Sequence, residues 1–171
     1  RVETTVAQVD AAYADYNPTR AARAIEQFVD DLSNWYVRRN RRRFWKTEAG
    51  PEKTAAYQTI FECLDRLAYM VGPIIPFYSD WLHRALTGCD DAESVHLGDF
   101  PEPDSTLVDV ELEHRVNLAR TVASTVLAIR NRVSINVRQP LQKIMVVTDA
   151  RVDEGSLEKM RAAVLDEVNV K

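Results

Sequence analysis

Apolar residues recur every three or four positions through most of the chain, and this spacing constrains the fold more than any other feature. Val2, Val6 and Val9 show it first, and Asn17-Pro18 then marks the start of a second helix. Asn is a favoured helix cap and Pro a favoured first helical residue. Because such spacing gives each helix one apolar stripe, the sequence predicts a mainly α-helical bundle.

The expected helices follow one another along the chain. The first covers about 2–16, the second starts at 18 and continues into an Arg-rich run, a third precedes Gly72, a fourth includes FYSDWLHRAL, and a fifth covers about 110–133. Between residues 88 and 109 we expect a long surface connection with a short extended piece, SVHLGDF. The LQKIMVV stretch, 141–147, has the composition of a strand, and 156–168 has the spacing of a last helix. The expected organisation is a helical domain at 1–136 and a small appended strand-helix (α/β) unit at 137–171.

Several classes of function lack their sequence signals. GxSxG, GxxxxGK[ST], GxGxxG and HExxH are absent, and the three histidines are scattered. Cys63 and Cys89 are not in a CxxC pattern, so we expect two reduced thiols and no metal site. No apolar run approaches the length of a membrane span, so we predict a cytoplasmic protein with no membrane partner. The chain lacks an initiator Met and opens inside an apparent helix, which favours an excised fragment.

Charge is sorted along the chain, although the net charge is only −4. Nine acidic residues and no Lys or Arg lie between Arg84 and Arg115, whereas residues 38–46 carry six Lys/Arg and no acid. A second basic stretch covers 115–143. If the helices that carry these two stretches, 38–46 and 115–143, are neighbours, they form one positive surface.

The densest chemistry is in Ser33–Lys46, SNWYVRRNRRRFWK, which combines two Trp, one Tyr and one Phe with the six cations. On the wheel of one continuous helix, the apolar stripe through Phe28 and Trp35 becomes cationic over its last two turns. Arginine binds phosphates and base edges through a planar fork, and aromatic rings stack on unpaired bases. The run therefore indicates contact with single-stranded RNA bases.

Structural explanations of the same residues stay open. Trp35 and Tyr36 continue the core stripe and fit a packing role. Arg38 and Arg41 point elsewhere on the wheel, where they would be solvated or lie over apolar neighbours. Cations at a helix C-terminus are also favoured by the helix dipole. A helical protein-interaction scaffold whose Arg-rich face binds an acidic partner is therefore the alternative function.

Four segments carry a family resemblance. LSNWYVRRNRRRFW resembles the stretch that opens the helical anticodon-binding domain of isoleucyl-tRNA synthetases, and SVHLGDFP, VRQPLQKIMV and DEVNVK resemble three further segments in the same order. Together they cover about residues 25–171. The resemblance implies the helical anticodon-binding domain of a class I aminoacyl-tRNA synthetase and the start of its C-terminal junction region.

The resemblance also implies a function for the longer protein, which joins isoleucine to its tRNA with ATP and Mg. The HIGH and KMSKS motifs of the catalytic domain have no counterpart here, so we expect tRNA binding without catalysis or cofactor in these residues. The implied partners are the anticodon stem-loop of isoleucine tRNA and the rest of the synthetase chain. We expect the protein to be a monomer.

Site residues follow from the resemblance position by position. We expect Arg39, Arg42, Arg43 and Lys46 to contact phosphates or anticodon-loop bases, and Trp45 to stack on a base. Three more members of the run, Arg38, Asn40 and Arg41, belong to the same predicted tRNA-binding set. Asn34 and Trp35 are expected to support the helix, and Arg138 and Lys143, near Gln139, form a second predicted group that touches tRNA or orients the junction region.

Overall fold

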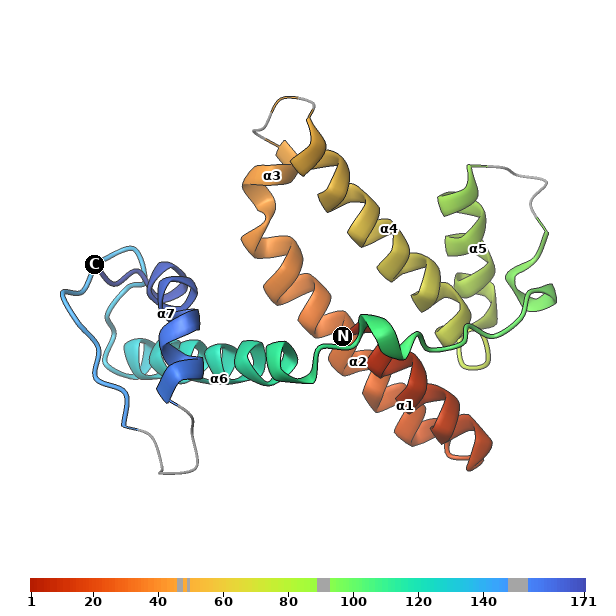
Figure 1. The fold of residues 1–171 in the computed structure, drawn as a ribbon, viewed down its shortest axis with the longest axis horizontal. Coiled ribbons are helices and arrows are strands. Elements are labelled where there is room, and N and C mark those ends of the chain that lie inside the picture. The colour runs from red at the N-terminus through yellow and green to blue at the C-terminus, as the bar shows by residue number, and fades with distance from the viewer. Residues whose placement is uncertain (46–47, 49, 89–92, 148–153) are drawn as a thin grey trace. The chain divides into compact units, whose positions relative to one another are not determined.

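The computed structural model describes residues 1–45, 48, 50–88, 93–147 and 154–171 (Figure 1). The chain divides into two compact units, Arg1–Val108 and Asp109–Lys171. Helices dominate both units, which confirms the mainly α-helical class predicted from the sequence. The division reflects compactness alone, so the domain boundary after residue 136 stays a prediction. No helix in the described residues is long and apolar enough to cross a membrane.

The first unit is built on four longer helices. These are α1 (Val2–Ala14), α2 (Pro18–Asp30), α4 (Pro51–Val71) and α5 (Pro76–Thr87). The start of α2 follows the sequence prediction, because Pro18 occupies its first turn and the Asn17 side chain accepts a hydrogen bond of 3.0 Å from the Arg20 N–H. This bond satisfies one of the N–H groups that a helix start leaves without a partner.

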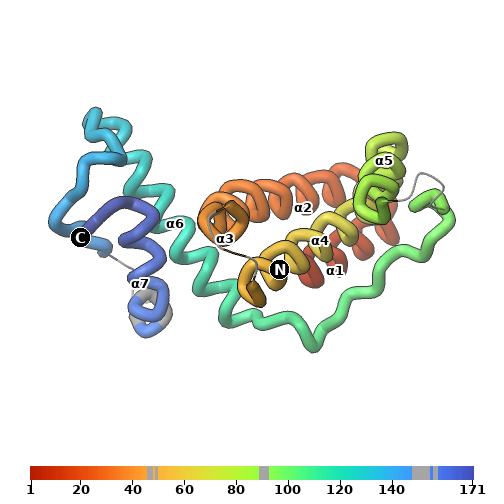
Figure 2. The backbone as a smooth tube through the Cα atoms, turned by 90° about the horizontal axis from the view of Figure 1, so that it is seen from above, coloured from red at the N-terminus to blue at the C-terminus, as the bar shows by residue number. Residues whose placement is uncertain are grey.

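The core of the first unit lies where α1, α2 and the C-terminal end of α4 meet (Figure 2). All three helices contribute buried apolar residues: Val6, Val9, Ala12, Ala21, Ile25, Phe28, Leu67, Met70 and Val71. The Tyr13 hydroxyl adds a polar tie, since it donates to the Met70 carbonyl at 2.8 Å. Figure 1 shows that α2 and α4 both extend from this core toward the short helix α3 (Arg41–Trp45). The start of α4 contacts α3 there.

Helix α5 packs back onto α4 through a buried hydroxyl. Ser79 is fully buried, and its Oγ donates to the Ala68 carbonyl at 2.6 Å. In the described part of the connection after α5, Val95–Leu97 forms a short 3-10 helix where we expected an extended piece. Asp80 fixes this turn by accepting a hydrogen bond of 3.2 Å from the Val95 N–H.

The connection then returns to the first helix. Asp104 precedes a second 3-10 turn, Ser105–Leu107, and its N–H donates to a Glu3 carboxylate oxygen at 2.8 Å. The same carboxylate lies 3.8 Å from the Arg66 guanidinium. Because Glu3 is buried, these two partners compensate a charge that would otherwise be costly to remove from water.

The second unit pairs α6 (Val110–Arg132) with α7 (Glu154–Val168). Asp109 caps α6, because its side chain accepts a 2.8 Å hydrogen bond from the Leu112 N–H. Ala119 and Ala123 of α6 and Val164 of α7 are buried. Small side chains on α6 allow the two helix backbones to approach closely. This contact between α6 and α7 stabilises the unit.

The strand predicted at 141–147 does not form in this structure. The described residues hold a single isolated parallel bridge, between Leu141 and Val170, and no strand. The predicted strand-helix unit is therefore not supported, although its helix is present as α7. The physical reason is that a strand exists only through hydrogen bonds to a neighbour, and beyond this bridge the described residues supply none.

Removal of the buried Ser79 hydroxyl tests the α4–α5 contact. Ser79→Ala leaves the Ala68 carbonyl without its partner, and we expect the free energy of unfolding to fall by about 1–2 kcal/mol. Urea unfolding followed by circular dichroism measures this loss. The matched control is Thr59→Ala, since the exposed Thr59 hydroxyl bonds only to Ala55 within its own helix. Equal stability of the two variants would contradict a structural role for the buried bond.

Burial controls the thiol chemistry of Cys63, which packs against the core of the first unit. Burial raises the pKa of this thiol from its ordinary 9.0 to about 11. The folded state therefore holds the proton more strongly than the unfolded state, and this contribution to stability is lost as the pH rises from 9 through 11. In a Cys89→Ser background, we expect the pH midpoint of alkylation to lie near 11. The same chain in urea is the control, and a midpoint unchanged by unfolding would contradict the expected pKa.

Candidate nucleic-acid interface

The basic residues begin where the second helix changes its geometry. After Asp30, α2 passes directly into a π-helix, η1 (Asp31–Val37), and then into a short helix, α3 (Arg41–Trp45). A π-turn contains more residues than an α-turn, so it rotates every later side chain relative to an α-helical wheel. The single continuous α-helix predicted through residue 46 is therefore wrong beyond Asp30. The rotation replaces the predicted cationic stripe with a different arrangement of the same residues.

Asn40 forms the turn between η1 and α3. Its backbone N–H and its Nδ2 both donate to the Tyr36 carbonyl, at 3.0 and 2.9 Å. On the other side of the turn, its carbonyl accepts from the Arg43 N–H at 2.8 Å, and its Oδ1 accepts from Arg43 Nη1 at 3.2 Å. Asn40 thus bonds to residues on both sides of the bend. It aims the first turn of α3.

Phe44 attaches α3 to α4. Its ring is buried, at 7% exposure, and its centroid lies 5.3 Å from that of Tyr57 and 6.5 Å from that of Tyr36. Both contacts are edge-to-face, the arrangement favoured by aromatic quadrupoles. The Tyr57 hydroxyl also donates to the Phe44 carbonyl at 3.5 Å. We did not predict a role for Phe44 from the sequence, although it is the apolar residue between RRR and Trp45.

The charged side chains around Phe44 face away from the core. Arg38, Arg41, Arg42 and Arg43 are exposed, and Trp45 keeps 68% of its surface accessible. We call Arg38–Trp45 the basic segment. Lys46, the last cation predicted for this site, lies outside the described residues. A five-residue helix pinned by one buried ring thereby presents several cations and an exposed indole to solvent.

Two of the arginines lie over tryptophan rings. The Arg39 guanidinium carbon is 4.8 Å from the centroid of Trp35, and that of Arg41 is 5.4 Å from the centroid of Trp45. These are cation-π distances. Arg39 and Trp35 are both half-buried, whereas Arg41 and Trp45 are exposed. The two pairs therefore combine the same chemistry with different access to a ligand.

Asn34 contacts its own helical segment. Its Nδ2 donates to the Asp30 carboxylate, and its carbonyl accepts from Arg38 Nε at 2.9 Å. The second contact holds the Arg38 side chain along the helix.

The second predicted group, Arg138 and Lys143, belongs to the other compact unit. Both side chains are exposed, and the Arg138 carbonyl accepts a 3.2 Å hydrogen bond from Asn169 Nδ2. The Arg138 N–H donates to Asn136 Oδ1 at 2.9 Å. A joint positive surface with the basic segment stays a prediction.

A buried arginine near this group was missed from the sequence. Arg130 is 2% exposed, and its Nη2 donates to the carbonyls of Asn136, at 2.6 Å, and Gln139. It holds the turn that leads to Arg138. The available signal was a cation on the apolar face of α6, seven residues after the buried Ala123.

The described residues offer no donor set for a metal. They contain no group of three or more His, Cys, Asp or Glu side chains that could hold an ion. They also lack a glycine-rich phosphate loop. The residues present therefore do not fit ATP and Mg.

Comparison with known proteins assigns the family. Residues 1–145 match the family model described as "Anticodon-binding domain of tRNA ligase". The chain belongs to this family. It is also 45% identical to an isoleucine–tRNA ligase of Bacteroides thetaiotaomicron and 47% identical to one of Bacteroides fragilis, in each case over 99% of this chain and 15% of the relative. An isoleucine–tRNA ligase of Dehalococcoides mccartyi is 41% identical over 97% of this chain and 17% of its own length.

These matches confirm the resemblance found in the sequence. The chain corresponds to the anticodon-binding region of isoleucine–tRNA ligases. It spans about 15–17% of the length of these relatives. The basic segment and its supporting turn fall inside the residues matched by the family model.

The role of Phe44 gives a prediction about the interface itself. Phe44→Ala removes the ring that attaches α3 to α4, so we expect the amides of residues 41–45 to exchange with solvent at least about tenfold faster. Hydrogen exchange followed by mass spectrometry measures this. Trp45→Ala is the matched control, because it removes the neighbouring exposed ring and should leave the exchange of α3 nearly unchanged. Equal effects of the two variants would mean that Phe44 is not the attachment point.

Proposed function

We propose that this chain is the tRNA-binding part of an isoleucine–tRNA ligase and that its basic segment contacts the anticodon stem-loop. The observation that carries this proposal is the seating of α3: a buried Phe44 fixes a short helix whose exposed residues are cations and an exposed tryptophan. The family match and the ligase relatives support it.

The chemistry of the exposed residues fits a folded RNA loop. Phosphate oxygens accept charge-assisted hydrogen bonds from arginine, while unstacked bases pack on aromatic rings. We assign Arg42 and Arg43 to phosphates or base edges, with Lys46 beside them in the sequence. Trp45 is the proposed stacking platform, and Arg41 over its ring adds a second planar group at the same place. An RNA base on this platform would meet π and cationic surface together.

The half-buried residues have a different proposed task. Arg39 packs over Trp35, so its guanidinium plane is held before any ligand arrives. Asn40 fixes the bend, and Asn34 and Arg38 bond along the helix. We propose that these contacts pre-orient the segment, which lowers the entropy lost on binding. Direct contacts of Arg38, Arg39 and Asn40 with tRNA remain part of the proposal.

The complete protein would supply the chemistry. We propose that it joins isoleucine to its tRNA with ATP and Mg, and that these ligands bind outside residues 1–171. Its partners would be isoleucine tRNA and the remainder of its own chain, with the protein acting as a cytoplasmic monomer. In this scheme the present chain contributes affinity for the tRNA and positions it, and it carries out no chemical step.

Salt-dependent binding tests the proposal. We expect the protein to bind an isoleucine tRNA transcript more tightly than the same transcript with a changed anticodon, and the affinity to fall steeply with salt. In the double variant Arg42→Ala, Arg43→Ala, we expect the affinity to drop about tenfold or more. The slope of log affinity against log salt should become shallower by about 1–2, since each lost phosphate contact removes roughly 0.7–0.9.

A control that removes a cation elsewhere tests whether any loss of positive charge weakens binding. Arg20→Ala removes one cation from the opposite end of α2, where Arg20 pairs with Asp15 at 3.0 Å. We expect it to bind almost as well as the unmodified protein, and circular dichroism should confirm that all variants stay helical. Unchanged binding by the double variant would contradict the assigned site. Binding that ignores the anticodon but follows salt would favour the acidic-partner scaffold.

A further inference from the structure

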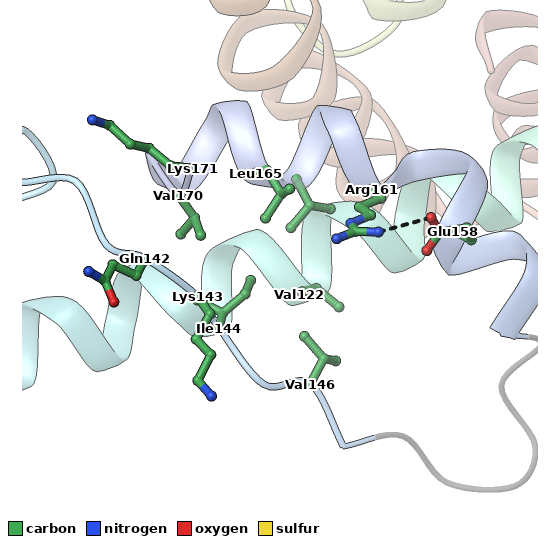
Figure 3. Close-up of a pocket in the computed structure, with 11 residues that line it drawn as sticks. Val122, Gln142, Lys143, Ile144, Val146, Glu158, Arg161, Leu165, Val170 and Lys171 are labelled. Carbon is green, nitrogen blue, oxygen red and sulfur yellow. Dashed lines mark hydrogen bonds and ion pairs between the residues drawn. The ribbon is translucent and has the colours of Figure 1, made fainter.

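The second unit contains an open groove beside the last residues of the chain (Figure 3). Its volume is about 420 Å³, and it lies between α7 and residues 142–146, with Val122 of α6 on its floor. The apolar side chains that line it are Val122, Ile144, Val146, Val164, Leu165 and Val170. Lys143 and Arg161 also border it, and Arg161 pairs with Glu158 at 3.2 Å. The groove is thus mostly apolar in its walls and charged at its border.

One wall of the groove has backbone groups that pair with no other described backbone group. Leu141 forms the parallel bridge with Val170: its N–H donates to the Asn169 carbonyl at 3.2 Å, and its carbonyl accepts from the Lys171 N–H at 3.0 Å. None of the N–H or C=O groups of residues 142–147 bonds to the backbone of another described residue. Met145 and Val147 are 84% and 96% exposed. The wall is an unpaired apolar edge, of the kind that natural proteins usually cover.

The bridge fixes both the direction and the register of a covering strand. In a parallel pair, one residue donates to and accepts from two residues on its neighbour that are two positions apart, as Leu141 does with Asn169 and Lys171. Continued by one step, the Lys143 N–H faces the Lys171 carbonyl, and the Lys143 carbonyl faces the second residue after Lys171. The backbone N–H and C=O groups of alternate residues point to opposite edges of a strand. Those of Met145 and Val147 would therefore face the new strand, as those of Lys143 do.

We propose that, in the longer protein, the residues that follow Lys171 form a strand that pairs in parallel with residues 142–147 and fills this groove. This rests on the proposed function, in which the chain is part of a ligase that continues beyond Lys171. Three observations favour this occupant over others. The last residues already lie in the correct register, α7 supplies the helical crossover that parallel strands need, and Val170 and Lys171 line the groove that the strand would enter.

Hydrogen exchange in the full-length protein, without tRNA, tests the pairing residue by residue. We expect the amides of Lys143, Met145 and Val147 to exchange about tenfold or more slowly than those of Gln142, Ile144 and Val146, which point to the opposite edge. Mass spectrometry with electron-transfer fragmentation can separate neighbouring amides. Because no tRNA is present, the result does not depend on whether the basic segment binds an anticodon.

Each other outcome would overturn the proposal. Fast exchange at all six amides would mean that no strand covers the edge, and slow exchange at the even-numbered positions would mean pairing on the wrong side. If the amides are fast without tRNA and become protected when the measurement is repeated with tRNA, the groove, with Lys143, would be assigned to RNA. Protection that grows with protein concentration would assign it to a second copy of the chain.

A matched pair of proline variants gives a second readout. Met145→Pro removes an N–H that faces the proposed strand, whereas Gln142→Pro removes one that faces away; both side chains are exposed. In full-length protein we expect Met145→Pro to abolish the slow exchange at Lys143 and Val147, and Gln142→Pro to preserve it. Loss of protection in both variants, or in neither, would contradict the register. tRNA affinity measured in parallel separates a failure of the strand from a failure of the proposed function.

Discussion

The burial of Phe44 is the contact on which the basic segment depends. A helix of five residues is too short to be stable by itself, and three consecutive arginines add mutual repulsion. Burial of a phenylalanine ring contributes about 1.5–3 kcal/mol, and its edge-to-face partners add about 0.5–1.5 kcal/mol each. The two tyrosines around Phe44 come from η1 and α4, so the ring joins the segment to both of its flanking helices. Without this contact the three arginines of α3 would have no fixed positions.

The π-helix explains why the arginine positions differ from those predicted on the wheel of one continuous α-helix. Apolar spacing correctly predicted the helices that form the core, because burial at intervals of three and four residues is a property of sequence alone. The π-turn at Asp31–Val37 has no comparable signal: its residues, DLSNWYV, are compatible with an ordinary α-helix. After this π-turn the chain bends at Asn40, and Phe44 packs against Tyr57 of α4. Local periodicity alone could not predict the rotation that the π-turn introduces.

The candidate site was likewise only partly predictable from the sequence. Its composition, cations interleaved with aromatics, was visible in the sequence, and so was the family resemblance. The pairing of Arg39 with Trp35 and of Arg41 with Trp45 was not predicted, although the residues of each pair are four positions apart, the spacing that brings helical side chains together. Arg130 was missed because a cation on an apolar stripe is buried only when carbonyl groups of a later turn converge on it. The strand predicted at 141–147 was wrong for another reason: its composition was suitable, but the described residues supply only one bridge and no neighbouring strand.

The main core and the proposed recognition site occupy different places in the first unit. The main core joins α1, α2 and the C-terminal end of α4. Near the beginning of α4, Tyr36 of η1 bonds to Ala56, and Phe44 of the basic segment contacts Tyr57. The uncharged core does not have to accommodate the repulsion among exposed arginines, because that repulsion is screened by water and salt at the surface. The same exposure leaves the cations able to exchange counterions for phosphates. In this protein one buried aromatic ring thus fixes α3 to the framework, while solvent surrounds most of the charges of the cationic run.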